Sequence, residues 1–248
     1  MASKWIKLHW TRPITADYPK IWRTFIGRDV DSDKLTEYRI EDLTESRYDD
    51  TIKHMEAFYL RDEPVSQIVG GSKDAQYIAD YGMICGSILR QGSSLVCLRA
   101  SSDQIVGVQT QYVITKADNF GKQAYERSQS PKTKKMYDVD AVLTKQFSVF
   151  DSYGVSEYLY LHNQAVDERF RGLNIALRMV EAGMQFCRHS NIKVMHGVFT
   201  SDFSSRACET FGFKDDLAIS VDELNKLRPE LGIQDMKSKQ LSIKSFVV

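Results

Sequence analysis

Residues 166–176 of this 248-residue chain read VDERFRGLNIA, and they join a run typical of a buried strand to a run typical of an amphipathic helix. The preceding run, YLYLHNQAV at 158–166, mixes aromatic and branched side chains without Pro or Gly, as the interior of a sheet does. From 173 to 187, apolar residues recur at three- and four-residue spacing, the pattern of one helix face. The sequence therefore predicts a strand, a tight turn and a helix.

The turn itself predicts an anion site. We expect Arg171 and Gly172 to open the helix, whose first N–H groups and dipole favour a negatively charged group. Glycine lets a diphosphate approach the backbone closely, and the arginine adds a fixed charge. The alternative is an ordinary helix start that carries an arginine.

A second segment, VMHGVFTSDFSSRACETFGF at 194–213, predicts another strand, a turn rich in hydroxyl groups and a short helix that ends at Gly212 and Phe213. Together the two segments resemble the GNAT superfamily of acyl-CoA-dependent N-acetyltransferases. The superfamily pattern after its central strand is Arg or Gln, two residues, Gly, one residue, then Gly or Ala. Arg171, Asn174 and Ala176 match it, with Asn174 where Gly is usual. Asparagine tolerates unusual backbone angles better than most residues, so the pattern is weakened but kept.

A third segment narrows the resemblance. Residues 58–65, FYLRDEPV, follow a helix-like run and resemble the Asp-Glu-Pro-Leu box of insect arylalkylamine N-acetyltransferases. Thr200 and Ser204 stand at the two serine positions of that family. The resemblance covers residues 36 to 245. It implies a mixed α/β GNAT fold: a central, mostly antiparallel sheet with helices on both faces and a splayed pair of central strands. We expect this acetyltransferase domain at 36–248, after an N-terminal extension at 1–35 that packs partly on it.

The resemblance also implies site residues. Glu63 is the expected general base, and the hydroxyl groups of Thr200 and Ser204 are expected beside the sulfur. The pantetheine arm of acetyl-CoA would pair with the strand edge, and the diphosphate would lie on the turn. The expected cofactor-binding residues are Ala165, Val166, Arg171, Gly172, Leu173, Asn174, Ile175 and Ala176.

Each role has an alternative. Glu63 would otherwise be a solvated acid before a proline, and Thr200 and Ser204 would cap a helix. Many GNAT enzymes place a tyrosine four residues before the glycine of the Gly-Phe pair, where this chain has Cys208. His162 and His196 on the two central strands are further candidate bases, although strand histidines more often have structural roles.

The resemblance implies a small primary amine as substrate, namely an arylalkylamine such as dopamine, serotonin, tryptamine or octopamine. One alternative is a non-aromatic amine such as agmatine, a polyamine or histamine. A second is a protein that binds acyl-CoA without turnover. Asn174 and Cys208 are the departures that keep this last alternative open.

Composition sets outer limits. With 33 acidic and 33 basic side chains, there is no overall field to attract nucleic acid or membranes. We find no apolar run approaching the ~20 residues of a membrane helix, and no signal peptide. We therefore expect a cytoplasmic protein, monomeric or weakly dimeric, whose partner is the small amine and not nucleic acid or a membrane. The four cysteines lack metal-binding spacing, so we expect free thiols and no metal.

The remaining pattern predicts the other elements. We expect Glu63 and Pro64 in a loop, residues 94–101 and 104–115 as an antiparallel hairpin, and residues 116–135, which are rich in lysine, as a solvated loop. The further expected strands are 36–42, 216–220 and 240–247, and the further expected helices are 48–60, 73–91, 136–150 and 221–228.

Overall fold

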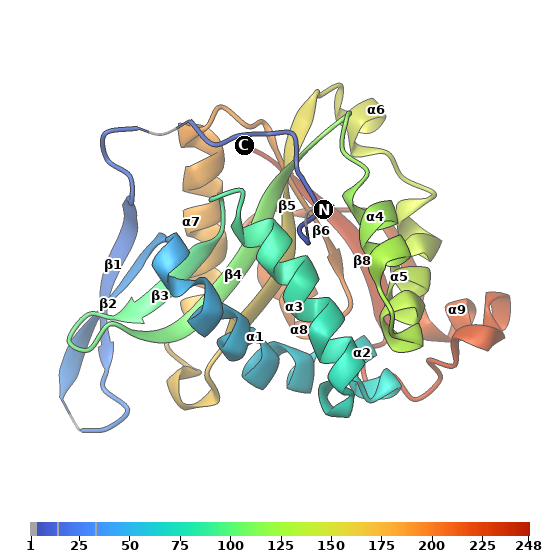
Figure 1. Ribbon diagram of the computed structural model, residues 1–248, viewed down its shortest axis with the longest axis horizontal. Helices are drawn as coiled ribbons and strands as arrows, with labels where there is room; N and C mark the ends of the chain where they lie inside the picture. Colours follow the sequence, from blue (N-terminus) through green and yellow to red (C-terminus); the bar gives the residue numbers. More distant parts are fainter. Residues whose placement is uncertain (1–3, 14, 33) are drawn as a thin grey trace.

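An eight-stranded sheet runs through the middle of the computed structural model, which describes residues 4–13, 15–32 and 34–248 (Figure 1). The strands lie in the order β1-β2-β3-β4-β5-β6-β8-β7, and every neighbouring pair is antiparallel except β5 and β6. The strands are β1 (Ile21–Arg28), β2 (Leu35–Asp42), β3 (Leu95–Arg99), β4 (Gln104–Thr115), β5 (Glu157–Val166), β6 (Val194–Phe199), β7 (Lys214–Ser220) and β8 (Gln240–Val247).

Helices cover both faces of this sheet. In Figure 1, α1 and α3 lie in front of the strands and α7 lies behind them. The helices are α1 (Tyr48–Asp62), α2 (Pro64–Val69), α3 (Ala75–Leu89), α4 (Phe120–Arg127), α5 (Pro131–Thr144), α6 (Val149–Tyr153), α7 (Ile175–His189), α8 (Asp202–Glu209) and α9 (Val221–Leu227). The expected architecture, a mostly antiparallel mixed sheet with helices on both faces, is confirmed.

The two central strands separate along their length. The β5–β6 ladder runs only from Leu159 opposite Met195 to Leu161 opposite Gly197. β5 nevertheless continues to Val166 and β6 to Phe199, while β4 stays paired with β5 as far as Val166. One edge of β5 is therefore unpaired with β6 beyond Leu161, which is the splay that we expected.

The lysine-rich segment at 116–135 is not the solvated loop that we predicted. It contains α4 and the first turn of α5. Phe120 and Ala124, four residues apart, are both buried and fix α4 against the domain. Ser130 caps α5 by accepting a hydrogen bond from the Lys132 N–H, so the helix begins earlier than the expected residue 136.

The first part of the chain contributes a strand. Within the segment expected to be an extension, β1 pairs with β2 from Ile21 opposite Glu41 onward. Asp42 is fully buried and binds both the guanidinium of Arg12, at 2.7 Å, and the indole N–H of Trp22, at 2.7 Å. These contacts fasten Arg12 and β1 to the end of β2.

All four cysteines are buried free thiols, as expected. In the described ranges, no helix has the length and apolar character needed to cross a membrane.

Candidate active site

Glu63 lies at the junction of α1 and α2 and is only 7% exposed. We predicted that Glu63 lies in a loop, but it caps α2 instead. Its carboxylate accepts hydrogen bonds from the N–H groups of Val65, at 3.0 Å, and Ser66, at 2.5 Å. Pro64 occupies the first helical position, where its missing N–H costs nothing. The Asp-Glu-Pro segment thus fixes the carboxylate group of Glu63 in the interior.

Thr200 completes this arrangement from a distant part of the chain. It follows β6 directly, and its hydroxyl donates to Glu63 Oε1 at 2.9 Å. The structure therefore brings two of the expected catalytic residues together where β5 and β6 separate. It does not bring Ser204 to Glu63, because the Ser204 hydroxyl donates to the Ser201 carbonyl in the first turn of α8, at 3.0 Å.

Ala165 and Val166 lie at the end of β5, where that strand pairs with β4. On the α1 side, the imidazole of His54 lies beside the Ala165 backbone. Burial lowers the pKa of His54 to about 4, so this ring is neutral at neutral pH. The strand edge at these two residues faces the splay and is suited to an extended ligand.

The turn before α7 differs from expectation in one respect. Arg171 and Gly172 do not open the helix, which begins at Ile175 after a three-residue turn. Gly172 and Asn174 adopt left-handed conformations, with φ of 85° and 56°, and both residue types tolerate them. The Asn174 side chain makes no capping hydrogen bond in the described structure, so the first N–H groups of α7 remain available to an anion.

The side chains around this turn point in different directions. Ile175 is buried in the hydrophobic core, and Leu173 packs against the same core. The Ala176 carbonyl accepts a hydrogen bond from the Gln164 side chain. The side chains of Leu173 and Ile175 are therefore occupied by the core, whereas the exposed Asn174 and the backbone of the turn can contact a ligand.

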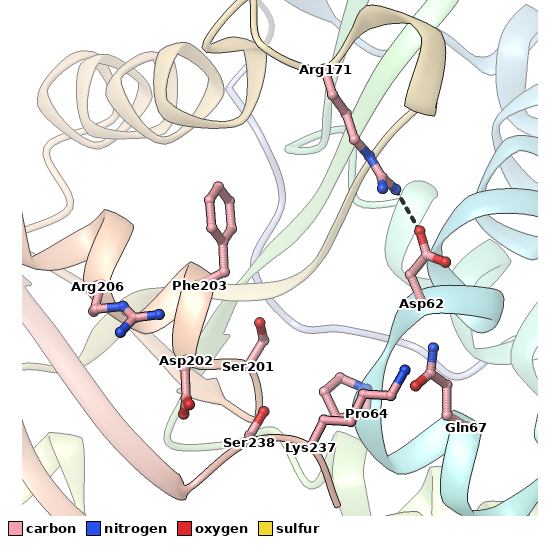
Figure 2. Close-up of a pocket in the computed structure, with 10 residues that line it drawn as sticks. All are labelled: Asp62, Pro64, Gln67, Arg171, Ser201, Asp202, Phe203, Arg206, Lys237 and Ser238. Carbon is pink, nitrogen blue, oxygen red and sulfur yellow. Dashed lines mark hydrogen bonds and ion pairs between the residues drawn. The ribbon is translucent and has the colours of Figure 1, made fainter.

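A cleft of about 530 Å³ opens beside this turn. Figure 2 shows Arg171 extended across it toward Asp62, with Phe203 and Arg206 of α8 on the other side. The carboxylate of Asp62 pairs with Arg171 and Arg61, and these hydrogen bonds lower the pKa of Asp62. Lys237 also lines the cleft, so three cationic side chains surround a space that suits a phosphate-bearing ligand.

Near Glu63 lies a group of tyrosines with a second acid, Asp140 of α5, to which no sequence motif points. Burial, and then the negative charge of Glu63, raise the pKa of Asp140 to about 7. The pKa of Tyr59 is raised by burial and by the charges of both acids. The only hint in the sequence was a charged residue inside the apolar run at 139–143.

An aromatic cavity of about 290 Å³ lies between the α5–α6 segment and the paired part of β5 and β6. Its walls include Thr144, Phe147, Phe150, Tyr158, Tyr160 and His196. His196 binds the Ser245 hydroxyl at 2.9 Å and stacks on Phe147.

The two candidate histidines are poor bases. Burial lowers the pKa of both His162 and His196 to about 3. Cys208, at the position of the usual tyrosine, belongs to the hydrophobic core, and burial raises the pKa of its thiol to about 12. None of these three groups is suited to exchange a proton near neutral pH.

No family model matches the chain. Among solved structures, the chain is similar to a protein of the yellow fever mosquito Aedes aegypti that is provisionally named insect arylalkylamine N-acetyltransferase 7. The two are 30% identical with a TM-score of 0.87, over 96% of this chain and 99% of that one. This chain also shares its fold with arylalkylamine N-acetyltransferase 2 of Aedes aegypti, at 21% identity and a TM-score of 0.74, over 85% of this chain and 98% of that one.

A third similar structure is the Drosophila melanogaster polyamine N-acetyltransferase that forms N-acetylagmatine. It is 16% identical with a TM-score of 0.70, over 85% of this chain and its own full length, a likeness of fold alone. The family assignment rests on the Aedes aegypti protein numbered 7, because it is similar to this chain in sequence and over nearly the whole length of both chains. With its splayed strands, its Asp-Glu-Pro box and this relative, the chain belongs to the insect arylalkylamine N-acetyltransferase family of the GNAT superfamily.

Proposed function

We propose that this protein transfers the acetyl group of acetyl-CoA to the primary nitrogen of a small amine. One observation carries the proposal: the buried carboxylate of Glu63 and the hydroxyl of Thr200 meet at the splay, next to the cationic cleft. The names of similar proteins, which are N-acetyltransferases, support the same reaction.

The residues around the cleft fit acetyl-CoA. Backbone N–H groups from Gly172 to Ala176, at an uncapped helix start, would hold the diphosphate, with Arg171 as a charged partner. The backbone of Ala165 and Val166 would pair with the amides of the pantetheine arm. When bound there, acetyl-CoA supplies the thioester carbonyl that the amine attacks.

Glu63 would bind the substrate ammonium and receive its proton, directly or through water. Its three hydrogen bonds, from Val65, Ser66 and Thr200, hold the carboxylate in one orientation. A fixed negative charge in a partly dry site attracts a cation strongly, which brings the ammonium to the base. Thr200, in turn, is the hydroxyl best placed to orient Glu63.

Two amine classes remain candidates for the substrate. The aromatic cavity supports an arylalkylamine, whose ring would pack against Phe147 and Tyr160. The carboxylate of Asp140 favours the second class, a small amine with another basic group.

A panel of amines, assayed by release of free thiol from acetyl-CoA, tests the reaction. We expect turnover with the wild-type protein and a loss of about 10²–10⁴-fold in kcat for Glu63→Gln, because general base catalysis contributes that much. Calorimetry should show acetyl-CoA binding retained in this variant. Glu230→Gln, the same change at an exposed position, is the matched control.

Two results would count against the proposal. If acetyl-CoA binds but no amine in the panel is acetylated, the protein is a non-catalytic acyl-CoA-binding member of the family. If Glu63→Gln keeps full kcat, another group removes the proton.

A further inference from the structure

Two side chains of α8, Phe203 and Arg206, form one wall of the cleft in Figure 2. The helix buries Ser205 and Cys208, and Phe203 and Arg206 are on its exposed side. Because residues three apart lie on the same face of a helix, the phenyl ring and the guanidinium are neighbours on this wall. Phe203 is 73% exposed, so most of its ring is open to a ligand.

The guanidinium of Arg206 has no carboxylate partner among the residues that the structure describes. Two acids of α8 are close enough along the helix to pair with it, Asp202 four residues before and Glu209 three residues after. The Asp202 carboxylate instead accepts the Lys239 N–H, at 3.2 Å, and points away from the guanidinium in Figure 2. Glu209 Oε1 accepts a hydrogen bond from Lys244 Nζ at 2.8 Å. The positive charge of Arg206 is therefore left for a ligand.

The third cation of the cleft, Lys237, belongs to a different wall. It lies between Met236 and Ser238, which are both buried and anchor this segment. Figure 2 shows the Lys237 side chain beside Pro64 of α2 and not beside Phe203. Phe203 and Arg206 thus form an aromatic and cationic pair of their own.

This pair is close to the proposed diphosphate site. Arg171, in the turn before α7, lines the same cleft, and in Figure 2 the Phe203 ring lies between Arg171 and Arg206. In acetyl-CoA the adenosine follows directly after the diphosphate, so a diphosphate on the turn brings the adenosine into this cleft. An aromatic ring suits a purine base, which stacks on it, and a guanidinium suits a phosphate, which it binds through parallel N–H···O hydrogen bonds.

We infer that Phe203 stacks on the adenine of acetyl-CoA and that Arg206 binds its 3′-phosphate. The inference rests on the proposed function, because that function places the diphosphate on the turn before α7. The pair lies on α8 and outside the turn, so it recognises a part of the cofactor that the turn does not. Selectivity for coenzyme A over 3′-dephospho-coenzyme A, which lacks only this phosphate, then depends on Arg206.

Calorimetry with these two compounds, in the absence of any amine, tests the role of Arg206. The wild-type protein should bind coenzyme A about tenfold more tightly than 3′-dephospho-coenzyme A, the value of one charge-assisted contact to phosphate. Arg206→Gln should reduce this ratio to less than about twofold and leave the affinity for 3′-dephospho-coenzyme A nearly unchanged. Lys237→Gln, with the same charge change on the other wall of the cleft, is the control and should keep the wild-type ratio.

The same measurement tests Phe203. Phe203→Ala should weaken the binding of both compounds by about tenfold, as expected for the loss of one base-stacking contact. Phe203→Tyr, which retains the ring, should bind both as the wild type does. The affinity for 4′-phosphopantetheine, which has no adenosine, should be the same in the wild type and in Phe203→Ala.

These results are separable from the outcome of the acetylation assay. If Arg206→Gln removes the preference for coenzyme A while no amine is acetylated, the proposed reaction fails and the adenosine site is supported. If amines are acetylated but the wild type and Arg206→Gln have the same ratio of affinities, the assignment of Arg206 is wrong. If Phe203→Ala binds both compounds as tightly as the wild type, the adenine lies elsewhere.

Discussion

At the scale of single residues, the two hydroxyl groups of the family pattern have different surroundings. The Thr200 hydroxyl donates to Glu63, whereas the Ser204 hydroxyl donates to the Ser201 carbonyl. We therefore predict that Thr200→Val, which keeps the shape of the side chain, lowers kcat about tenfold or more, since a misplaced base loses its geometry. Ser204→Ala should change kcat by less than about twofold, because Ser204 only closes a helical turn.

Steady-state kinetics at saturating acetyl-CoA would measure both effects, with the midpoint of thermal unfolding to confirm that each variant is folded. Equal losses of kcat in the two variants would show that Ser204 also acts on the reacting groups.

The sequence could reveal some residues of the site but not others. Glu63 was identifiable because a proline follows it in a recognisable box, and Thr200 because it precedes a helix that ends in Gly-Phe. Asp140 belongs to no such pattern. Its surroundings depend on which side of α5 faces α2, and a hydrophobic cluster that includes Val65 and Val139, far apart in the chain, decides this.

At the scale of elements, an ion pair connects the turn before α7 with the end of α1. Arg171 reaches Asp62 across the cleft, so its guanidinium is positioned by an ion pair before any ligand binds. We predict that Arg171→Ala raises the KM for acetyl-CoA about tenfold, the value of one charge-assisted contact to phosphate, and leaves kcat nearly unchanged.

Kinetics with varied acetyl-CoA at saturating amine would measure this effect, and added salt should weaken wild-type binding more than that of the variant. Arg188→Ala, at the opposite end of α7, is the control. A fall in kcat with unchanged KM would place Arg171 outside the phosphate site.

Elements with strong local signals were predicted well, and those that depend on distant partners were not. The hairpin of β3 and β4 combines alternating residues with a short turn, and both strands are found where expected. β1 was not predicted, because Ile21 and Ile26 are exposed and the strand has no clear alternation of buried apolar residues. Its place in the sheet depends on pairing with β2. α4 escaped because only Phe120 and Ala124 anchor a segment that is otherwise polar.

At the scale of the whole molecule, one parallel pair within an antiparallel sheet makes the site possible. β5 and β6 part after three paired residues, and each strand remains held on its outer side, by β4 and by β8. The opening is therefore rigid, and residues of α1, α2 and α8 line the cleft beside it. The family pattern predicted this opening, but the amine side also depends on how the helices pack.

The interior histidines make the stability of the whole molecule depend on pH. Burial lowers the pKa of His54 to about 4 and that of His162 and His196 to about 3, against about 6.5 in an unfolded chain. Between pH 6.5 and 4 the unfolded chain therefore binds more protons at these sites, so stability falls as the pH falls. Asp140 has the opposite effect on stability. Because its pKa is raised in the folded state, the folded protein binds a proton at Asp140 at a higher pH than the unfolded chain does.

The net difference near pH 5 is about two protons, so the free energy of unfolding should decrease by about 3 kcal/mol per pH unit there. Chemical denaturation at several pH values would measure this slope. His162→Gln should reduce it by about 1.4 kcal/mol per pH unit, since one titrating group is removed. Asp140→Asn should make the slope steeper by a similar amount, because the opposing group is lost. If His162→Gln leaves the slope as it is, the His162 imidazole is already protonated in the folded protein, and its environment is more polar than its position on β5 implies.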